Sequence, residues 1–141
     1  MSRIYWDTML FIYLLEDHPV FAPRTHELLE RAYKRDDSLF TSYLALGEMM
    51  AGASKSPNPK TAETVAEIIR EMGFSFLPFD GGAVAPFSAL RSKQKIRIAD
   101  AIHLACAASA GIDLYLTGDT QLFKLDVPGI QFIADFNSPI L

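Results

Sequence analysis

Apolar and polar positions along the chain follow two alternating spacings, one typical of strands and one typical of helices. Short runs rich in β-branched and aromatic residues predict strands over residues 3–6, 38–42, 74–79, 114–117 and 130–133. Apolar residues three and four positions apart predict helices over residues 8–16, 23–36, 43–53, 59–72, 83–94, 98–110 and 120–125. Strands that alternate with helices favour a parallel sheet covered on both faces, so the pattern predicts an α/β fold.

Residues that start or stop helices support several of these boundaries. Pro23 suits the first turn of its helix, and Gly73 follows the end of the helix before it. Asp80 is predicted to cap the next helix, with Pro86 in the first turn of that helix. The stretch at 54–59, rich in proline and serine, is too short for a domain boundary and predicts a loop between two helices.

The composition fits a single globular domain. The chain has 141 residues, of which 50% are apolar and 21% charged, and this excludes a disordered chain. The longest apolar run near the start, Met9–Leu15, is shorter than the roughly 18 residues that a membrane-spanning helix needs. Since no convincing export signal is present, we expect a cytoplasmic protein with no membrane partner. Cys106 is the only cysteine, which excludes an internal disulfide and a cysteine-based zinc site.

The charge is slightly acidic overall, with one basic segment. The 13 Lys and Arg residues and the 17 Asp and Glu residues give a net charge of −4, which argues against a broadly basic nucleic-acid-binding surface. Positive charge gathers in one place, at Arg91, Lys93, Lys95 and Arg97. Two interpretations stay open: a solvated helix end and loop, or a strip that binds RNA phosphates beside an acidic site.

Two carboxylates follow predicted strands at the edge where parallel sheets bind ligands. Asp7 directly follows the strand at 3–6, and Asp119 lies just beyond the strand at 114–117. Ligands of such sheets bind outside the carboxyl ends of the strands, where the strand order reverses. An aspartate in this place can equally cap the next helix, so each residue has a structural alternative.

Two further acids lie inside apolar helices. Glu48 has no Lys or Arg between Thr41 and Ser54, and burial of an uncompensated carboxylate is costly. Its side chain must therefore face solvent or meet a cation from elsewhere in the fold. Asp100 lies near the start of an Ala-rich helix, where the helix dipole or Arg97, three residues earlier, could stabilise it.

These four acids form a candidate ligand set for a metal ion. Mg²⁺ and Mn²⁺ prefer carboxylate and water ligands, and a bound ion would let repelling carboxylates stay ionised. One or two such ions can generate a hydroxide and stabilise an in-line displacement at phosphorus, so the residues predict hydrolysis of a phosphodiester. His103, three residues after Asp100, could lie behind such a site, but we interpret it as a packed or surface histidine.

Four segments, in order, resemble the PIN-domain nucleases and most closely the VapC-type ribonuclease toxins: Ile4–Thr8, Leu44–Glu48, Ile98–Ala105 and Leu116–Asp119. The last two are the most specific, because they carry Asp-Ala-x-x-x-Ala in a helix and then Thr-x-Asp after a strand. The resemblance covers essentially the whole chain and implies one PIN-like domain over residues 1–141. It implies a three-layer α/β/α sandwich with a five-stranded parallel sheet in the order 3-2-1-4-5.

The resemblance also implies roles for particular residues. The family's catalytic and metal-binding acids match Asp7, Glu48, Asp100 and Asp119. Thr117 would support the last acid or orient a water. If the RNA-binding interpretation of the basic segment holds, Arg91, Lys93, Lys95 and Arg97 would bind the substrate beside the acids. Met9 stands where relatives often carry Asn or Ser, so a polar contact of the family is either missing here or supplied differently, for example by Thr8.

The implied function is a Mg²⁺- or Mn²⁺-dependent endoribonuclease whose products carry a 5′ phosphate and a 3′ hydroxyl. It would be the toxin of a toxin–antitoxin pair, with RNA as substrate, a small antitoxin as partner and a homodimer as assembly. A catalytically silent binding module of the same fold is the alternative, with the acids as caps and surface charge. A phosphotransferase of the haloacid-dehalogenase type fits less well, because Asp7-Thr8-Met9 lacks the second aspartate of its Asp-x-Asp motif.

Overall fold

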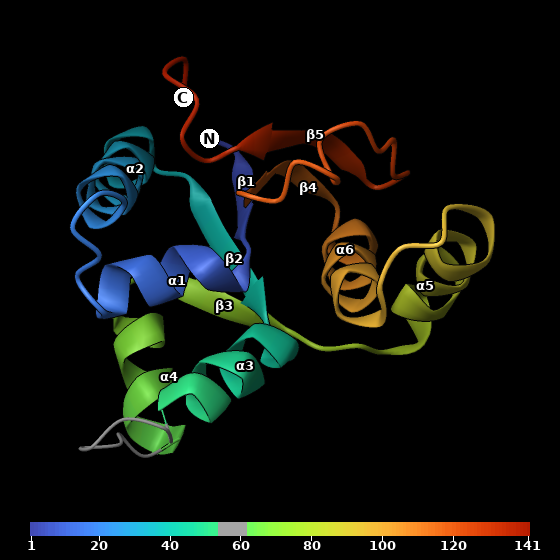
Figure 1. The fold of residues 1–141 in the computed structure, drawn as a ribbon, viewed down its shortest axis with the longest axis horizontal. Helices are drawn as coiled ribbons and strands as arrows, with labels where there is room; N and C mark the ends of the chain where they lie inside the picture. The colour runs from blue at the N-terminus through green and yellow to red at the C-terminus, as the bar shows by residue number, and fades with distance from the viewer. Residues whose placement is uncertain (54–61) are drawn as a thin grey trace.

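The computed structural model describes residues 1–53 and 62–141. Within these residues, five strands alternate with six helices (Figure 1). In chain order they are β1 (Arg3–Trp6), α1 (Thr8–Leu15), α2 (Ala22–Arg35), β2 (Ser38–Ser42), α3 (Tyr43–Ala53), α4 (Ala62–Glu71), β3 (Phe74–Leu77), α5 (Gly81–Lys93), α6 (Ile98–Ala110), β4 (Ile112–Thr117) and β5 (Ile130–Asp135).

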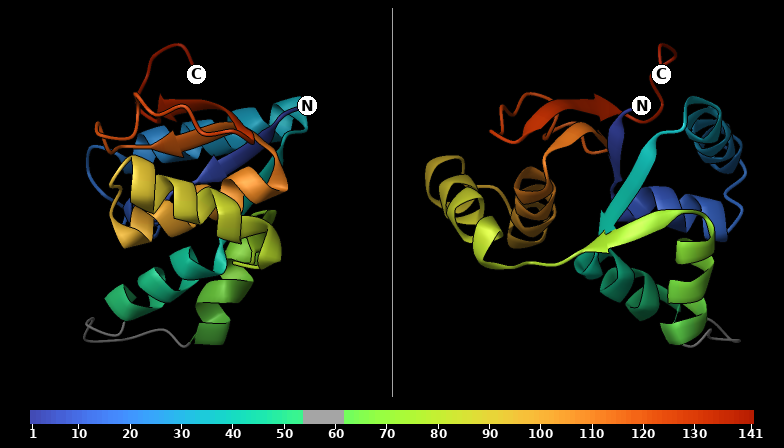
Figure 2. Two further views of the ribbon diagram at one scale, coloured as in Figure 1. Left: turned by 90° about the vertical axis from the view of Figure 1, so that its right-hand side faces the viewer. Right: turned by 180° about the vertical axis from the view of Figure 1, so that it is seen from behind.

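The strands form one parallel sheet in the order β3-β2-β1-β4-β5. β1 lies in the middle, where Ile4 is opposite Leu39 on β2 and Leu114 on β4. Figures 1 and 2 show α5 and α6 together on one side of the sheet and α1 with α2 on the other. The predicted α/β/α sandwich and its strand order are confirmed.

Neighbouring residues of β1 are buried on opposite faces of the sheet. Ile4 and Trp6 belong to the core that includes residues of α1 to α4, whereas Tyr5 packs with residues of α5 and α6. Successive side chains of a strand point to opposite faces, so a strand covered on both sides is a continuous apolar run. This alternation puts Tyr5 on the α6 side of the sheet, two residues before Asp7.

The helix predicted over 120–125 is wrong. This segment is a series of turns, in which Leu122 N–H donates to the Asp119 carbonyl and Leu125 N–H to the Leu122 carbonyl. These bonds span three residues, and so short a segment gains too few bonds to offset the cost of starting an α-helix. The apolar residues that suggested a helix have another role. Leu122 in this segment, and Val127 just after it, are buried in the core with residues of α5 and α6.

Other differences from the predicted elements concern their ends. β3 stops at Leu77, because Pro78 has no N–H for the sheet. Asp80 caps α5 as predicted, accepting from Gly82 N–H at 3.1 Å, but α5 starts at Gly81, so Pro86 lies in the second turn and not the first. The predicted loop at 54–59 and the predicted start of the following helix lie outside the described residues.

The helices are short. The longest described one, α2, has 14 residues. Within residues 1–53 and 62–141, no helix combines the length and the apolar character that a membrane crossing requires.

Candidate functional site

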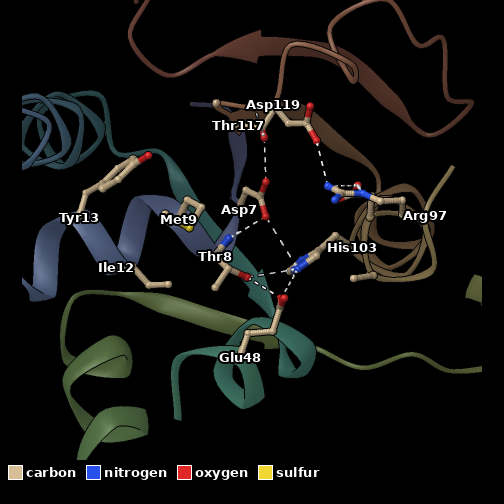
Figure 3. Close-up of a pocket in the computed structure, with 13 residues that line it drawn as sticks. Asp7, Thr8, Met9, Ile12, Tyr13, Glu48, Arg97, His103, Thr117 and Asp119 are labelled. Carbon is tan, nitrogen blue, oxygen red and sulfur yellow. Dashed lines mark hydrogen bonds and ion pairs between the residues drawn. The ribbon is translucent and has the colours of Figure 1, made fainter. Parts of the chain in front are cut away.

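The carboxyl ends of β1 and β4 meet at the point where the strand order reverses. Trp6 pairs with Leu116 across these strands, and Asp7 N–H donates to the Leu116 carbonyl at 3.0 Å. A cavity of about 570 Å³ opens beside this point (Figure 3). All four predicted acids line it, although they come from separate parts of the chain: Asp7, Glu48, Asp100 and Asp119.

Asp7 is held at both of its carboxylate oxygens. Oδ1 accepts from Thr8 N–H at 2.8 Å, which makes Asp7 the N-cap of α1. Oδ2 accepts from the Thr117 hydroxyl at 2.7 Å. The Thr117 oxygen in turn accepts from Asp119 N–H at 3.1 Å, so this buried threonine links the first acid to the main chain of the last. Capping by Asp7 and its place in the cavity are therefore compatible.

Glu48 meets two donors from other elements. Its Oε1 accepts from the Thr8 hydroxyl at 2.8 Å and lies 2.7 Å from His103 Nε2 (Figure 3). The hydrogen bond from His103 lowers the pKa of Glu48, against the opposing effect of partial burial. The partner from elsewhere in the fold is thus an imidazole on α6 and not a Lys or Arg.

His103 lies in the site, which was the less favoured of the two interpretations of this residue from the sequence. It is packed, as expected, with 2% of its surface exposed. Its ring nevertheless lines the cavity, and its Nδ1 lies 2.6 Å from the Tyr5 hydroxyl. The one available signal was its spacing: it follows Asp100 by three residues, which puts both on one side of α6.

Asp100 and Asp119 share one cation. Arg97 Nε donates to Asp100 Oδ2 at 3.1 Å, and an Arg97 terminal nitrogen lies 3.5 Å from Asp119 Oδ2. The predicted pairing of Arg97 with Asp100 is confirmed. Partial burial raises the pKa of Asp100, Arg97 opposes this rise, and the charges of Asp7 and Asp119 add to it. Because 76% of the Arg97 side chain is exposed, water and salt screen the bridge.

The basic segment is divided between the cavity and the surface. Arg97 lines the cavity. Arg91 donates to the Ile96 carbonyl at 2.8 Å, and the side chains of Lys93 and Lys95 are exposed. The predicted strip therefore starts at the site and continues into solvent along the end of α5.

The cavity also has an apolar edge formed by α1, at Met9, Ile12 and Tyr13. Met9 is 43% exposed and lies at the cavity where relatives were expected to carry a polar residue. The neighbouring Thr8 supplies the polar contacts, since its hydroxyl donates to Glu48 and lies 3.2 Å from His103 Nε2.

The carboxylates fall into two pairs with different partners. We call these the Asp7–Glu48 side, which contacts Thr8, Thr117 and His103, and the Asp100–Asp119 side, which contacts Arg97. In the described part of the chain, no three Asp, Glu, His or Cys side chains are already grouped to hold an ion. The donor chemistry still fits Mg²⁺ or Mn²⁺, because carboxylate oxygens around a water-accessible cavity are the ligands that these ions prefer.

Comparisons with known proteins show which proteins the chain resembles in sequence and in fold. The chain is 27% identical over 121 residues to "Ribonuclease VapC23" of Mycobacterium tuberculosis, covering 84% of this chain and 94% of that protein. Its fold is similar to that of VapBC2 from Rickettsia felis bound to a promoter DNA fragment, with a TM-score of 0.74, 20% identity and coverage of 94% and 98%. A toxin–antitoxin complex from Klebsiella pneumoniae is similar at a TM-score of 0.65, with 23% identity and coverage of 92% and 95%.

A family model gives the assignment. The model described as PIN domain matches residues 4–128, a range that contains all four cavity acids and runs from β1 through β4, ending before β5. This agrees with the strand order and with the resemblance of the four sequence segments. The chain belongs to the PIN domain family.

Proposed function

We propose that this protein is a divalent-metal-dependent endoribonuclease and the toxin of a toxin–antitoxin pair. One observation carries the proposal: carboxylates 41, 52 and 19 residues apart along the chain line a single cavity, at Asp7, Glu48, Asp100 and Asp119. A metal-dependent nuclease needs such a group of oxygen ligands at a water-accessible surface. The likeness to "Ribonuclease VapC23" supports RNA as the substrate.

The four acids would hold Mg²⁺ or Mn²⁺, which supplies a hydroxide-like nucleophile and neutralises charge at the reacting phosphate. The chain's own residues orient these ligands. Thr117 and Thr8 N–H fix the Asp7 carboxylate, whereas Thr8 and His103 hold one oxygen of Glu48. Both of these bonds to Glu48 end on Oε1, and so Oε2 is the atom that Glu48 would offer to an ion.

The basic segment would bind the RNA backbone beside the acids. Arg97 lies at the cavity, and the exposed Lys93 and Lys95 extend its positive charge away from it. An overall charge of −4 disfavours binding elsewhere on the surface, so binding should depend on these few phosphate contacts and on salt. Arg91, which donates to the Ile96 carbonyl, would add charge at the far end of the segment.

The proposed partners follow from the relatives. The similar structures from Rickettsia felis and Klebsiella pneumoniae are described as VapBC2 and as a toxin–antitoxin complex. We propose that this chain likewise pairs with a small antitoxin that covers the cavity, assembles as a homodimer and acts in the cytoplasm.

RNA cleavage by matched proteins tests the proposal. Wild-type protein with Mn²⁺ should cut a mixed RNA pool, and the cut ends should carry 5′ phosphates. Asp100→Asn keeps the shape of the side chain but removes its charge, so this variant should not cut. Equal cutting by both proteins would indicate a contaminating nuclease. No cutting by either, across metals and RNA pools, would favour a catalytically silent binding module.

A further inference from the structure

A chain of buried polar groups lies directly behind Glu48. The Tyr5 hydroxyl is 2.6 Å from His103 Nδ1, and His103 Nε2 is 2.7 Å from Glu48 Oε1. Tyr5 and His103 are 0% and 2% exposed. These two hydrogen bonds join β1 to α6 and α6 to α3, between residues that are 98 and 55 positions apart in the sequence. Buried polar groups are costly unless every one of them is satisfied, so this arrangement has to be accounted for.

For a neutral His103 ring, the chemistry of the partners gives the hydrogen bonds one direction. A carboxylate can only accept, so the His103 nitrogen that faces Glu48 must carry a hydrogen. In a neutral imidazole the other nitrogen then has none and accepts. With His103 neutral, the Tyr5 hydroxyl at 2.6 Å is the nearest donor to fill it and donates to Nδ1, whereas the Ser42 hydroxyl lies farther away, at 3.4 Å. Tyr5 thus selects the tautomer in which His103 donates to Glu48.

Packing prevents the two rings from turning away. Tyr5 stacks on Tyr115 at 4.8 Å between ring centroids, with 8° between the planes. The His103 ring meets Tyr5 edge-on at 6.0 Å. The Ser42 hydroxyl, 3.4 Å from His103 Nδ1, also accepts from Ala45 N–H in the first turn of α3, the helix that carries Glu48. Ser42 therefore contacts both the His103 ring and the first turn of the helix that carries Glu48.

We propose that Tyr5 and His103 are positioning residues that hold Glu48 Oε1, so that Oε2 faces the cavity as a ligand for a divalent cation. Neither residue acts on the substrate itself. The inference rests on the proposed function, because only in that function is Glu48 a ligand of a metal ion. The outer partners of metal ligands orient those ligands, and their loss typically weakens metal binding.

Tyr5 has a matched control beside it. Tyr115 is equally buried and forms the other half of the stacked pair, but its hydroxyl has no hydrogen-bond partner in the described part of the chain. Tyr5→Phe and Tyr115→Phe each remove one buried hydroxyl and leave the rings stacked. Only Tyr5→Phe removes the group that selects the His103 tautomer.

Calorimetric titration with Mn²⁺ gives the first measurement. Tyr5→Phe should bind Mn²⁺ about 10-fold more weakly than wild type, whereas Tyr115→Phe should bind as wild type does. Imidazole ¹⁵N shifts give the second measurement in metal-free protein. His103 should carry its proton on Nε2 in wild type and in Tyr115→Phe, and should lose this preference in Tyr5→Phe. The second measurement responds to the hydrogen bond and not to packing.

Each result decides between the possibilities. Equal Mn²⁺ affinity in Tyr5→Phe and wild type, or a proton on Nδ1 in wild type, would overturn the positioning role and leave the proposed nuclease intact. Absence of Mn²⁺ binding by wild type would overturn the proposed function, and the positioning role with it. If Tyr5→Phe does not fold, His103→Gln and His103→Leu replace it. Glutamine retains an N–H donor and should recover part of the affinity that leucine loses, and equal loss in both would overturn the role.

Discussion

The two sides of the cavity hold their carboxylates in different ways. On the Asp7–Glu48 side, buried hydroxyls and the His103 ring hold the oxygens at 2.7 to 2.8 Å. On the Asp100–Asp119 side, the contact is a largely exposed guanidinium at 3.1 and 3.5 Å. The pKa of Glu48 is lowered by its hydrogen bond to His103, whereas burial raises the pKa of Asp100.

This difference indicates a division of roles within the proposed metal site. Hydrogen bonds from buried donors fix geometry before any ligand arrives, and they are barely screened by salt. An exposed ion pair contributes little energy and is easily exchanged for another cation. The Asp7–Glu48 side is therefore preorganised, whereas on the Asp100–Asp119 side the oxygens that face Arg97 can exchange this partner for a metal ion, although Asp119 Oδ1 also accepts from Gln121 N–H at 3.0 Å.

The largest effect is expected when the preorganised side is disrupted at Thr117. Thr117→Val keeps the branched shape that suits β4 but leaves Asp7 Oδ2 and Asp119 N–H without their shared partner. A fully buried group left unsatisfied costs about 1–3 kcal/mol, and because these two groups are only partly buried the free energy of unfolding should fall by the lower end of that range. Loss of a ligand-orienting group should also reduce Mn²⁺ affinity and RNA cleavage about 10- to 100-fold.

Urea unfolding and Mn²⁺ titration would measure these two losses separately. Thr120→Val is the control, because Thr120 lies exposed three residues further along and should leave both quantities unchanged. If Thr117→Val matched Thr120→Val in both stability and Mn²⁺ affinity, the buried hydroxyl of Thr117 would not contribute to the Asp7–Glu48 side, and the proposed difference between the two sides would be wrong.

A smaller effect of opposite sign is expected at Arg97. Arg97→Gln removes the cation that competes with a metal ion for Asp100 and Asp119. The metal-free protein should lose only about 0–1 kcal/mol of stability, because the ion pair is exposed. The rise in melting temperature on adding Mn²⁺ should be larger than in wild type, since tighter binding to the folded state stabilises it further.

Arg91→Gln is the matched control for this change. It removes the same charge from the same segment, but its side chain donates to the Ile96 carbonyl and does not line the cavity. Its Mn²⁺-induced shift should equal that of wild type. A smaller shift in Arg97→Gln than in Arg91→Gln would mean that Arg97 supports the ligands rather than competing for them.

The contacts on the two sides of the cavity also differ in how well they could be predicted from the sequence. The Arg97–Asp100 pair could be anticipated because it is local, with its members three positions apart at the start of a helix. The acids themselves, the strand order and the Asp80 cap were likewise indicated by strand ends, helix signals and family motifs. These features depend on short segments whose residue types carry the information.

The contacts of His103 could not be predicted in this way. They join residues 55 and 98 positions apart, and an isolated histidine in an Ala-rich helix more often has a packing role. The missing helix at 120–125 has the same origin. Leu122 and Leu125 have helical spacing, but the segment is too short to offset the cost of starting a helix, and Leu122 is buried in the core from a turn. In both cases tertiary packing decides what local pattern leaves open.

The smallest expected effect is on RNA binding by the part of the basic segment that lies beyond Arg97. Lys95 is exposed and follows the end of α5, so it should contact an RNA phosphate weakly if the strip binds RNA at all. In an Asp100→Asn background, which should leave RNA uncut, Lys95→Gln should lower the slope of log affinity against log salt by about 0.7. Lys34→Gln, on the exposed last turn of α2, should leave that slope unchanged. If both variants kept the wild-type slope, the segment beyond Arg97 would be a solvated helix end. The positive charge that accompanies the acids would then be confined to Arg97, the one cation that the cavity itself contacts among the four of the segment.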